Sequence, residues 1–159
     1  MKKAYVIGSN VKKSLSPLIF KYWFKQNKIA GEYLPREIEP ENFNEELKKI
    51  LKEGGVCGFN VTIPFKERVI REIDTLDEHA KKIGAVNFIS KTESGWIGKN
   101  TDWIGFSKAI NIKKVALNKK IAVVVGYGGA SKAVIYALKK ENFKEIKVFN
   151  RTEEKIHHL

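Results

Sequence analysis

The sequence predicts an α/β fold built around a mainly parallel sheet, and three observations lead to that prediction. Short apolar runs of strand length alternate along the chain with longer segments whose apolar residues recur at helical spacing. Glycine or proline stands at many of the junctions between the two kinds of segment. Hydrophobic residues make up 43% of the 159 residues, which is enough to bury a core and excludes intrinsic disorder.

The first third of the chain contains two strand–helix pairs. Residues 4–7 form a short buried strand that ends at Gly8, and a helix then starts at Ser16-Pro17 and runs to about Lys28. Serine suits the cap of that helix, and proline suits its first turn. The next expected elements are a strand over 32–38 and an amphipathic helix over 41–52, which Gly54-Gly55 stops.

The middle of the chain adds a second strand–loop–helix unit and a hairpin. The expected elements are a strand over 56–62, a helix opened by Pro64, a helix over 77–83, a hairpin of strands over 86–89 and 95–97 around the polar turn 91–94, and a helix over 101–111. A change of composition at 113–120 marks a domain boundary. We therefore divide the chain into a substrate-binding domain over 1–101, a linking helix and connector over 102–118, and a βαβ unit over 119–159.

A glycine-rich turn joins an expected strand over 121–125 to a helix over 130–140, and a second strand over 146–149 follows. Its first glycine permits a tight turn, its second lets the backbone approach a pyrophosphate, and the helix N-terminus supplies N–H donors and a positive dipole end. These features predict an incomplete Rossmann-type dinucleotide-binding domain. A tight turn without a ligand is the alternative, because Ser131 stands where Gly or Ala is usual. The expected cofactor residues in the turn are Gly126, Gly128, Gly129, Ala130 and Ser131.

The end of the second strand indicates which dinucleotide binds. A site selective for NAD needs Asp or Glu there to hold the ribose hydroxyls. This strand instead ends at Asn150-Arg151-Thr152, and Arg151 can clamp a 2′-phosphate with two charge-assisted hydrogen bonds. We therefore expect these three residues to bind NADP, with a solvated strand-end arginine as the alternative.

Polar residues also gather at the ends of elements in the first domain, where open α/β sheets bind ligands. Hydroxyls of Ser14 and Ser16 beside a helix N-terminus can bind a carboxylate, although N-capping alone would explain Ser16. Lys66 stands one turn into the helix expected after Pro64, where the helix dipole favours a neutral lysine that acts as a general base. Further candidates are Thr62, Asn87 and Asn100-Thr101-Asp102, each of which also has a purely structural explanation.

Taken together, these motifs resemble the shikimate dehydrogenase family. Ser-x-Ser-Pro, Asn-Val-Thr-x-Pro-x-Lys, Gly-Ala-Val-Asn, Asn-Thr-Asp-x-x-Gly, Gly-x-Gly-Gly-Ala and Asn-Arg-Thr occur in the family's order and rough spacing, from Ile7-Gly8 to Thr152. The resemblance implies an NADP-dependent oxidoreductase that reversibly reduces 3-dehydroshikimate to shikimate in aromatic amino-acid (chorismate) biosynthesis. It implies that Lys66 and Asp102 form the catalytic pair, and that the substrate is bound by Ser14, Ser16, Thr62, Lys66, Asn87 and Asp102. Quinate-type substrates stay open, because discrimination by one hydroxyl depends on pocket geometry.

Three features depart from the family's pattern. Lys13 precedes Ser14 where histidine is common, and Phe88 follows Asn87 where threonine is usual. Family members also continue well beyond Leu159. We therefore expect a chain that folds its first domain, has weak or no dehydrogenase activity, and self-associates, as a homodimer for example, through its incomplete nucleotide domain. A non-catalytic module that binds the substrate is the alternative.

Composition argues against several other classes of protein. The net charge is +12, but nearly all the basic residues are lysines spread along the chain, which favours a solvated surface over a nucleic-acid interface. Cys57 is the single cysteine, which excludes an intramolecular disulfide and a Cys-based zinc site and fits a reducing cytoplasm. No apolar run approaches the ~20 residues of a membrane span, and we expect no signal peptide. The expected protein is cytoplasmic and binds a small molecule, without a metal, a membrane or nucleic acid; nucleic-acid binding is the weakest alternative.

Overall fold

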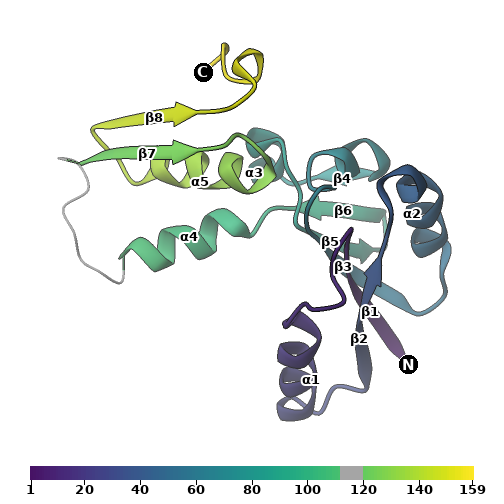
Figure 1. Ribbon diagram of the computed structural model, residues 1–159. Helices are drawn as coiled ribbons and strands as arrows, with labels where there is room; N and C mark the ends of the chain where they lie inside the picture. Colours follow the sequence, from purple (N-terminus) through teal and green to yellow (C-terminus); the bar gives the residue numbers. More distant parts are fainter. Residues whose placement is uncertain (112–119) are drawn as a thin grey trace.

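A computed structural model of the chain describes residues 1–111 and 120–159. It contains a six-stranded sheet with strand order β2-β1-β3-β5-β6-β4 and a separate two-stranded sheet of β7 and β8. Figure 1 shows the large sheet on one side of the molecule and the β7-β8 pair with α5 on the other, where α4 lies beside α5. The strands are β1 (Lys2–Gly8), β2 (Gly31–Glu37), β3 (Val56–Val61), β4 (Thr75–Leu76), β5 (Phe88–Thr92), β6 (Gly95–Lys99), β7 (Ile121–Val125) and β8 (Glu145–Phe149). The helices are α1 (Ser16–Gln26), α2 (Phe43–Lys52), α3 (Glu78–Ile83), α4 (Asp102–Asn111) and α5 (Gly129–Lys140), with short 3-10 helices η1 (Pro40–Asn42), η2 (Arg68–Glu72) and η4 (Glu153–Lys155).

The large sheet is mixed, with parallel pairs in the majority. β1 runs parallel to both β2 and β3, and β4 runs parallel to β6. β5 runs antiparallel to β3 and to β6. The antiparallel pair of β5 and β6 is the hairpin predicted around the polar turn, since a tight turn returns the chain beside the strand it has just left. The α/β class with a mostly parallel sheet is therefore confirmed.

Two helices cover opposite faces of this sheet. Successive side chains of β1 point to opposite sides, so both faces carry apolar side chains that a helix can cover. On one face, α2 buries Phe43, Leu47 and Ile50 in the main core, and Phe43 stacks on Phe65 with ring centroids 4.3 Å apart. Burial of a side chain of this size contributes roughly 1.5–3 kcal/mol, so α2 anchors the domain. On the other face, α1 has no fully buried residue and packs through Phe20 and Phe24.

The last segment forms the expected βαβ unit. β7 and β8 pair in parallel, and α5 between them buries Ala133, Ile135, Ala137 and Leu138. The same helix packs against α3 and α4, so it also joins the unit to the large domain. The opposite face of the small sheet is exposed. In the part of the chain that the structure describes, no helix is long and apolar enough to cross a bilayer.

Two local predictions are wrong. Pro64 does not open a helix: residues 62–67 form turns around a cis Ile63–Pro64 bond, and η2 begins only at Arg68. Tertiary partners take the backbone groups that a helix needs, since the Ile63 carbonyl accepts from Ser9 N–H and the Lys66 carbonyl accepts from Val86 N–H.

Ser16 does not cap α1 either. Leu15 occupies the cap position in a helical conformation, and Ser14 Oγ accepts the Ser16 N–H at 3.2 Å. A capping side chain needs an extended backbone, which this turn does not provide. The sequence also predicted no strand at Thr75–Leu76. Part of the predicted connector, 112–118, lies outside the described residues.

Candidate functional site

The six residues expected to bind the substrate line a single cavity. Its volume is about 730 Å³, and it lies beyond the ends of β1 and β3, next to the start of α1. Parallel neighbouring strands end at the same edge of a sheet, which is why side chains from separate motifs meet there. The polar lining residues are Asn10, Lys13, Ser14, Ser16, Asn60, Thr62, Lys66, Asn87, Thr101 and Asp102.

Lys66 and Asp102 form an ion pair in this cavity. Lys66 Nζ lies 2.6 Å from Asp102 Oδ2, and the two side chains are 14% and 30% exposed. Asp102 is the first residue of α4, where the helix dipole stabilises a carboxylate. The helix invoked for Lys66 does not exist, because Lys66 follows β3 in a turn. The two residues of the predicted pair are therefore in contact. The electrostatics differ from the prediction, because Lys66 interacts with Asp102 directly and the helix dipole involved is that of α4, which acts on Asp102.

Asn87 fixes the orientation of the Asp102 carboxylate. Its Nδ2 donates to Asp102 Oδ1 at 2.8 Å and to Thr101 Oγ1 at 2.9 Å, so both amide hydrogens are used. Its Oδ1 accepts the Thr101 N–H at 2.8 Å. Asn100 supports the same turn, because its Oδ1 accepts the Asp102 N–H and its Nδ2 donates to the Ala85 carbonyl. Both oxygens of Asp102 are thus held, one by Asn87 and one by Lys66.

A hydrogen-bonded chain behind the cavity was not predicted. Tyr33 donates through its hydroxyl to Asn60 Oδ1 at 2.8 Å, and Asn60 Nδ2 donates to the Asn87 carbonyl at 3.1 Å. Burial raises the pKa of the Tyr33 hydroxyl, with a smaller opposing effect of the Ser16 side chain. Asn60 begins the Asn-Val-Thr motif, which could have identified it. Tyr33 carries no such signal, because it is one apolar position of a strand.

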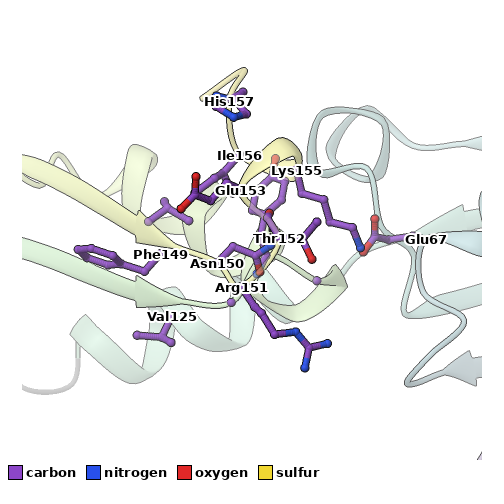
Figure 2. Close-up of a pocket in the computed structure, with 14 residues that line it drawn as sticks. Glu67, Val125, Phe149, Asn150, Arg151, Thr152, Glu153, Lys155, Ile156 and His157 are labelled. Carbon is purple, nitrogen blue, oxygen red and sulfur yellow. Dashed lines mark hydrogen bonds between the residues drawn. The ribbon is translucent and has the colours of Figure 1, made fainter.

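A second cavity, of about 820 Å³, lies at the glycine-rich turn and the end of β8 (Figure 2). Five of the expected cofactor residues line it: Gly126, Gly128, Asn150, Arg151 and Thr152. Gly126 has φ +98°, a left-handed conformation that favours glycine. Asn150 Oδ1 accepts the Tyr127 N–H at 3.0 Å and so ties the turn to the end of β8.

The other three expected cofactor residues lie elsewhere. Ala130 and Ser131 line a separate small cavity beside β7, and Gly129 packs against the side chain of Lys66. Two basic side chains frame the large cavity, since Lys155 joins Arg151 among its lining residues. Figure 2 shows Arg151 extending away from the other labelled side chains, whereas Lys155 reaches toward Glu67. Lys155 was missed by the sequence reasoning, although its place shortly after Asn150-Arg151-Thr152 could have identified it.

Fold and site together define a class: α/β proteins with one polar pocket at the ends of parallel strands and a second pocket at a glycine-rich βα turn, the two places where such sheets bind ligands. Residues 6–89 match the family model described as the shikimate dehydrogenase substrate binding domain. The chain belongs to the shikimate dehydrogenase family.

Individual relatives agree with this assignment. The chain is 43% identical, over 152 residues, to the shikimate dehydrogenase (NADP(+)) of Aquifex aeolicus, covering 94% of this chain and 55% of that relative. Shikimate dehydrogenase 1 of Peptoclostridium difficile superimposes with a TM-score of 0.90 at 34% identity, covering 98% of this chain and 59% of that one. The shikimate 5-dehydrogenase of Thermus thermophilus, solved with NADP(H) and shikimate, gives a TM-score of 0.85 at 31% identity, covering 98% and 58%. The chain thus spans a little over half the length of these relatives.

Proposed function

We propose that this chain forms the substrate pocket and the first part of the NADP pocket of a shikimate dehydrogenase, which reversibly reduces 3-dehydroshikimate to shikimate. The observation that carries the proposal is the Lys66–Asp102 ion pair inside a polar cavity next to the glycine-rich turn. Relatives named for this NADP-dependent reaction, and a neighbour solved with both ligands, support it.

The proton work falls to Lys66 and Asp102 as a pair. During reduction the carbonyl oxygen of the substrate gains a proton, and during oxidation the hydroxyl loses one. Lys66 Nζ is a donor already positioned by Asp102 Oδ2 at 2.6 Å. Because the two groups share one hydrogen bond, we assign the proton transfer to the pair and not to either residue alone. Asn87 keeps the carboxylate in place throughout.

Ser14, Ser16 and Thr62 hold the substrate in this proposal. Ser14 Oγ already accepts the Ser16 N–H, so its own hydroxyl proton is available to a ligand. Hydroxyl donors and a lysine on one cavity wall suit a small carboxylate that carries ring hydroxyls.

The second cavity offers NADP an open glycine-rich turn and two basic side chains. The left-handed Gly126 leaves the turn open to a pyrophosphate, and Arg151 with Lys155 suits a 2′-phosphate. When bound, the nicotinamide supplies or accepts the hydride. Gly126, Gly128, Asn150, Arg151 and Thr152 are the residues that would hold this cofactor.

Titration of the chain with shikimate, quinate, NADP⁺ and NAD⁺, together with absorbance at the nicotinamide band, tests the function. We expect binding of shikimate and NADP⁺, and at most weak NADP⁺ reduction that depends on shikimate. A chain that binds shikimate without any reduction is the non-catalytic module of the alternative interpretation. A chain that binds neither ligand contradicts both.

We also propose that the chain self-associates through the small sheet. On the face of this sheet away from α5, Val123 is 60% exposed and Val125 82% exposed, beside exposed Ile121 and Phe149. An apolar face with free strand edges favours pairing with a second copy. Light scattering after size exclusion should give a dimer or larger species, and Val123→Lys should shift it to the monomer. A monomeric wild-type chain contradicts this.

A further inference from the structure

One face of α5 is fastened to the substrate domain at three points, spaced as residues on one side of a helix are. Gly129 packs against Lys66, Lys132 pairs with Glu67, and the Tyr136 hydroxyl lies 2.8 Å from His79 Nδ1. The first two contacts are neighbours. Gly129 and Lys132 are one turn apart on α5, and their partners Lys66 and Glu67 are adjacent in the sequence.

The contact at Gly129 is unusually close. A Cβ built at this position would lie 2.8 Å from Lys66 Cβ and 3.4 Å from Ala85 Cβ. The backbone of α5 therefore rests directly on the residue that we assign to proton transfer. Gly126 and Gly128 of the glycine-rich turn come just before Gly129, so any shift of α5 along this contact moves them relative to Lys66.

The ion pair beside this contact is partly shielded from water. Lys132 Nζ lies 2.5 Å from Glu67 Oε2, and the side chains are 19% and 44% exposed. Lys132 Nζ also lies 5.2 Å from the centre of the Tyr127 ring, within the turn. Glu67 itself lines the nucleotide cavity, although a carboxylate there opposes a bound phosphate. Cofactor binding therefore does not explain why an acidic residue stands at position 67.

We propose that Glu67 and Lys132 are positioning residues for the reaction: their ion pair holds the start of α5, and with it the glycine-rich turn, at a set distance from Lys66. The inference rests on the proposed function. The distance between the glycine-rich turn and Lys66 matters because the substrate and the cofactor must react across it. Hydride transfer is steep in distance, and a displacement of about 1 Å can cost roughly 10²-fold in rate. Loss of a single, partly shielded ion pair should displace α5 by less than this distance, so we expect a smaller fall in rate.

The two single variants separate positioning from simple charge effects. Glu67→Gln removes a negative charge and Lys132→Met removes a positive one, so charge alone shifts NADP⁺ affinity in opposite directions. Loss of the pair, in contrast, slows both variants in the same direction. We expect kcat to fall about tenfold in each, with KM for shikimate within about twofold of wild type. Lys132→Arg keeps a positive charge that can pair with Glu67, and its kcat should stay close to that of wild type.

The matched control is the Glu78–Lys82 pair, which has the same residue types on the exposed side of α3. Glu78→Gln and Lys82→Met should leave kcat unchanged. Amide hydrogen exchange of residues 132–135, whose N–H groups bond to the carbonyls at the start of α5, gives a readout without turnover: we expect it to accelerate about fivefold in Glu67→Gln and Lys132→Met, and not in the controls.

The outcomes distinguish this inference from the proposed function. A wild-type chain without turnover or ligand binding contradicts the proposed function, and hydrogen exchange then decides alone whether the pair holds α5. Unchanged exchange in both variants overturns the proposal. So does wild-type kcat in both variants of an active chain, or a pair of variants that differ from wild type only in opposite shifts of NADP⁺ affinity.

Discussion

Asn87 Nδ2 donates a 2.8 Å hydrogen bond to Oδ1 of Asp102, while Lys66 Nζ lies 2.6 Å from Oδ2 of the same carboxylate. Asn87 comes from the turn after α3, Asp102 from the start of α4 and Lys66 from the turn after β3. Three segments thus meet on one carboxyl group, which leaves Asp102 a single orientation. The chemistry of the cavity depends on this arrangement.

In a complete enzyme, Lys66→Ala should lower turnover by ~10²-fold or more, because it removes the donor in proton transfer. Affinity for shikimate should change only modestly, since other polar side chains line the cavity. Steady-state kinetics and calorimetric titration measure the two effects. Lys81→Ala, an exposed lysine of α3, is the matched control. Near-normal turnover of Lys66→Ala would remove Lys66 from the reaction.

Asn87→Leu should lower both stability and turnover. The part-buried Thr101 N–H and one oxygen of Asp102 lose their partners, at a cost of about 1–3 kcal/mol in the free energy of unfolding. Turnover should fall because Asp102 is then free to rotate. Urea unfolding and kinetics give the two values, and a variant as stable as wild type contradicts the hydrogen-bond network.

Gly129→Ala should destabilise the chain by about 1–3 kcal/mol, because the added methyl group overlaps Lys66 Cβ. Gly105→Ala in α4 is the control, since a Cβ there meets nothing within 4 Å. That substitution should stabilise the helix by about 0.5–1 kcal/mol. Urea midpoints of the two variants should therefore move in opposite directions. Equal shifts would mean that α5 does not rest on Lys66.

Arg151→Gln should weaken NADP⁺ binding by about 1.5–3 kcal/mol, the value of a charge-assisted hydrogen bond. Affinity for NAD⁺ should stay nearly constant, because it lacks the 2′-phosphate. Fluorescence titration with both cofactors measures the selectivity, and Lys155→Gln tests the second basic residue in the same way. Equal losses for NADP⁺ and NAD⁺ would place the 2′-phosphate elsewhere.

Glu53 links stability in acid to β1 of the large sheet. Hydrogen bonds from Lys3, and then from Tyr5, lower the pKa of the Glu53 carboxyl below its ordinary value of 4.5. Its stabilising contribution is thus present above the unfolded-state pKa and is lost as the pH falls through the lower folded-state value. Glu53→Gln should be less stable than wild type near neutral pH, and the gap should close in acid. Urea unfolding across this range measures it; a constant gap contradicts the linkage.

Local pattern predicted most of the elements. The apolar run of β7 has the expected bounds, Ile121–Val125, and α5 begins one residue before its expected start. The hairpin of β5 and β6 follows from two strands around a polar turn. The helix expected at Pro64 failed because long-range backbone hydrogen bonds to Ser9 and Val86 hold that segment in turns. Such partners are not visible in a local window of sequence.

For the site, the motifs along the chain already indicated which residue types stand at the strand ends: serines, Thr62, Lys66, Asn87 and Asp102 in one domain, and a glycine-rich turn with Arg151 in the other. Those assignments depend on local periodicity, on glycine conformation and on the common edge of parallel strands. Only the tertiary structure decided that Asn87 orients Asp102, that Asn60 links Tyr33 to Asn87, and that α5 rests on Lys66 through Gly129 and the Lys132–Glu67 pair. These contacts join segments far apart in the chain, and their distances are set by how helices and sheet pack.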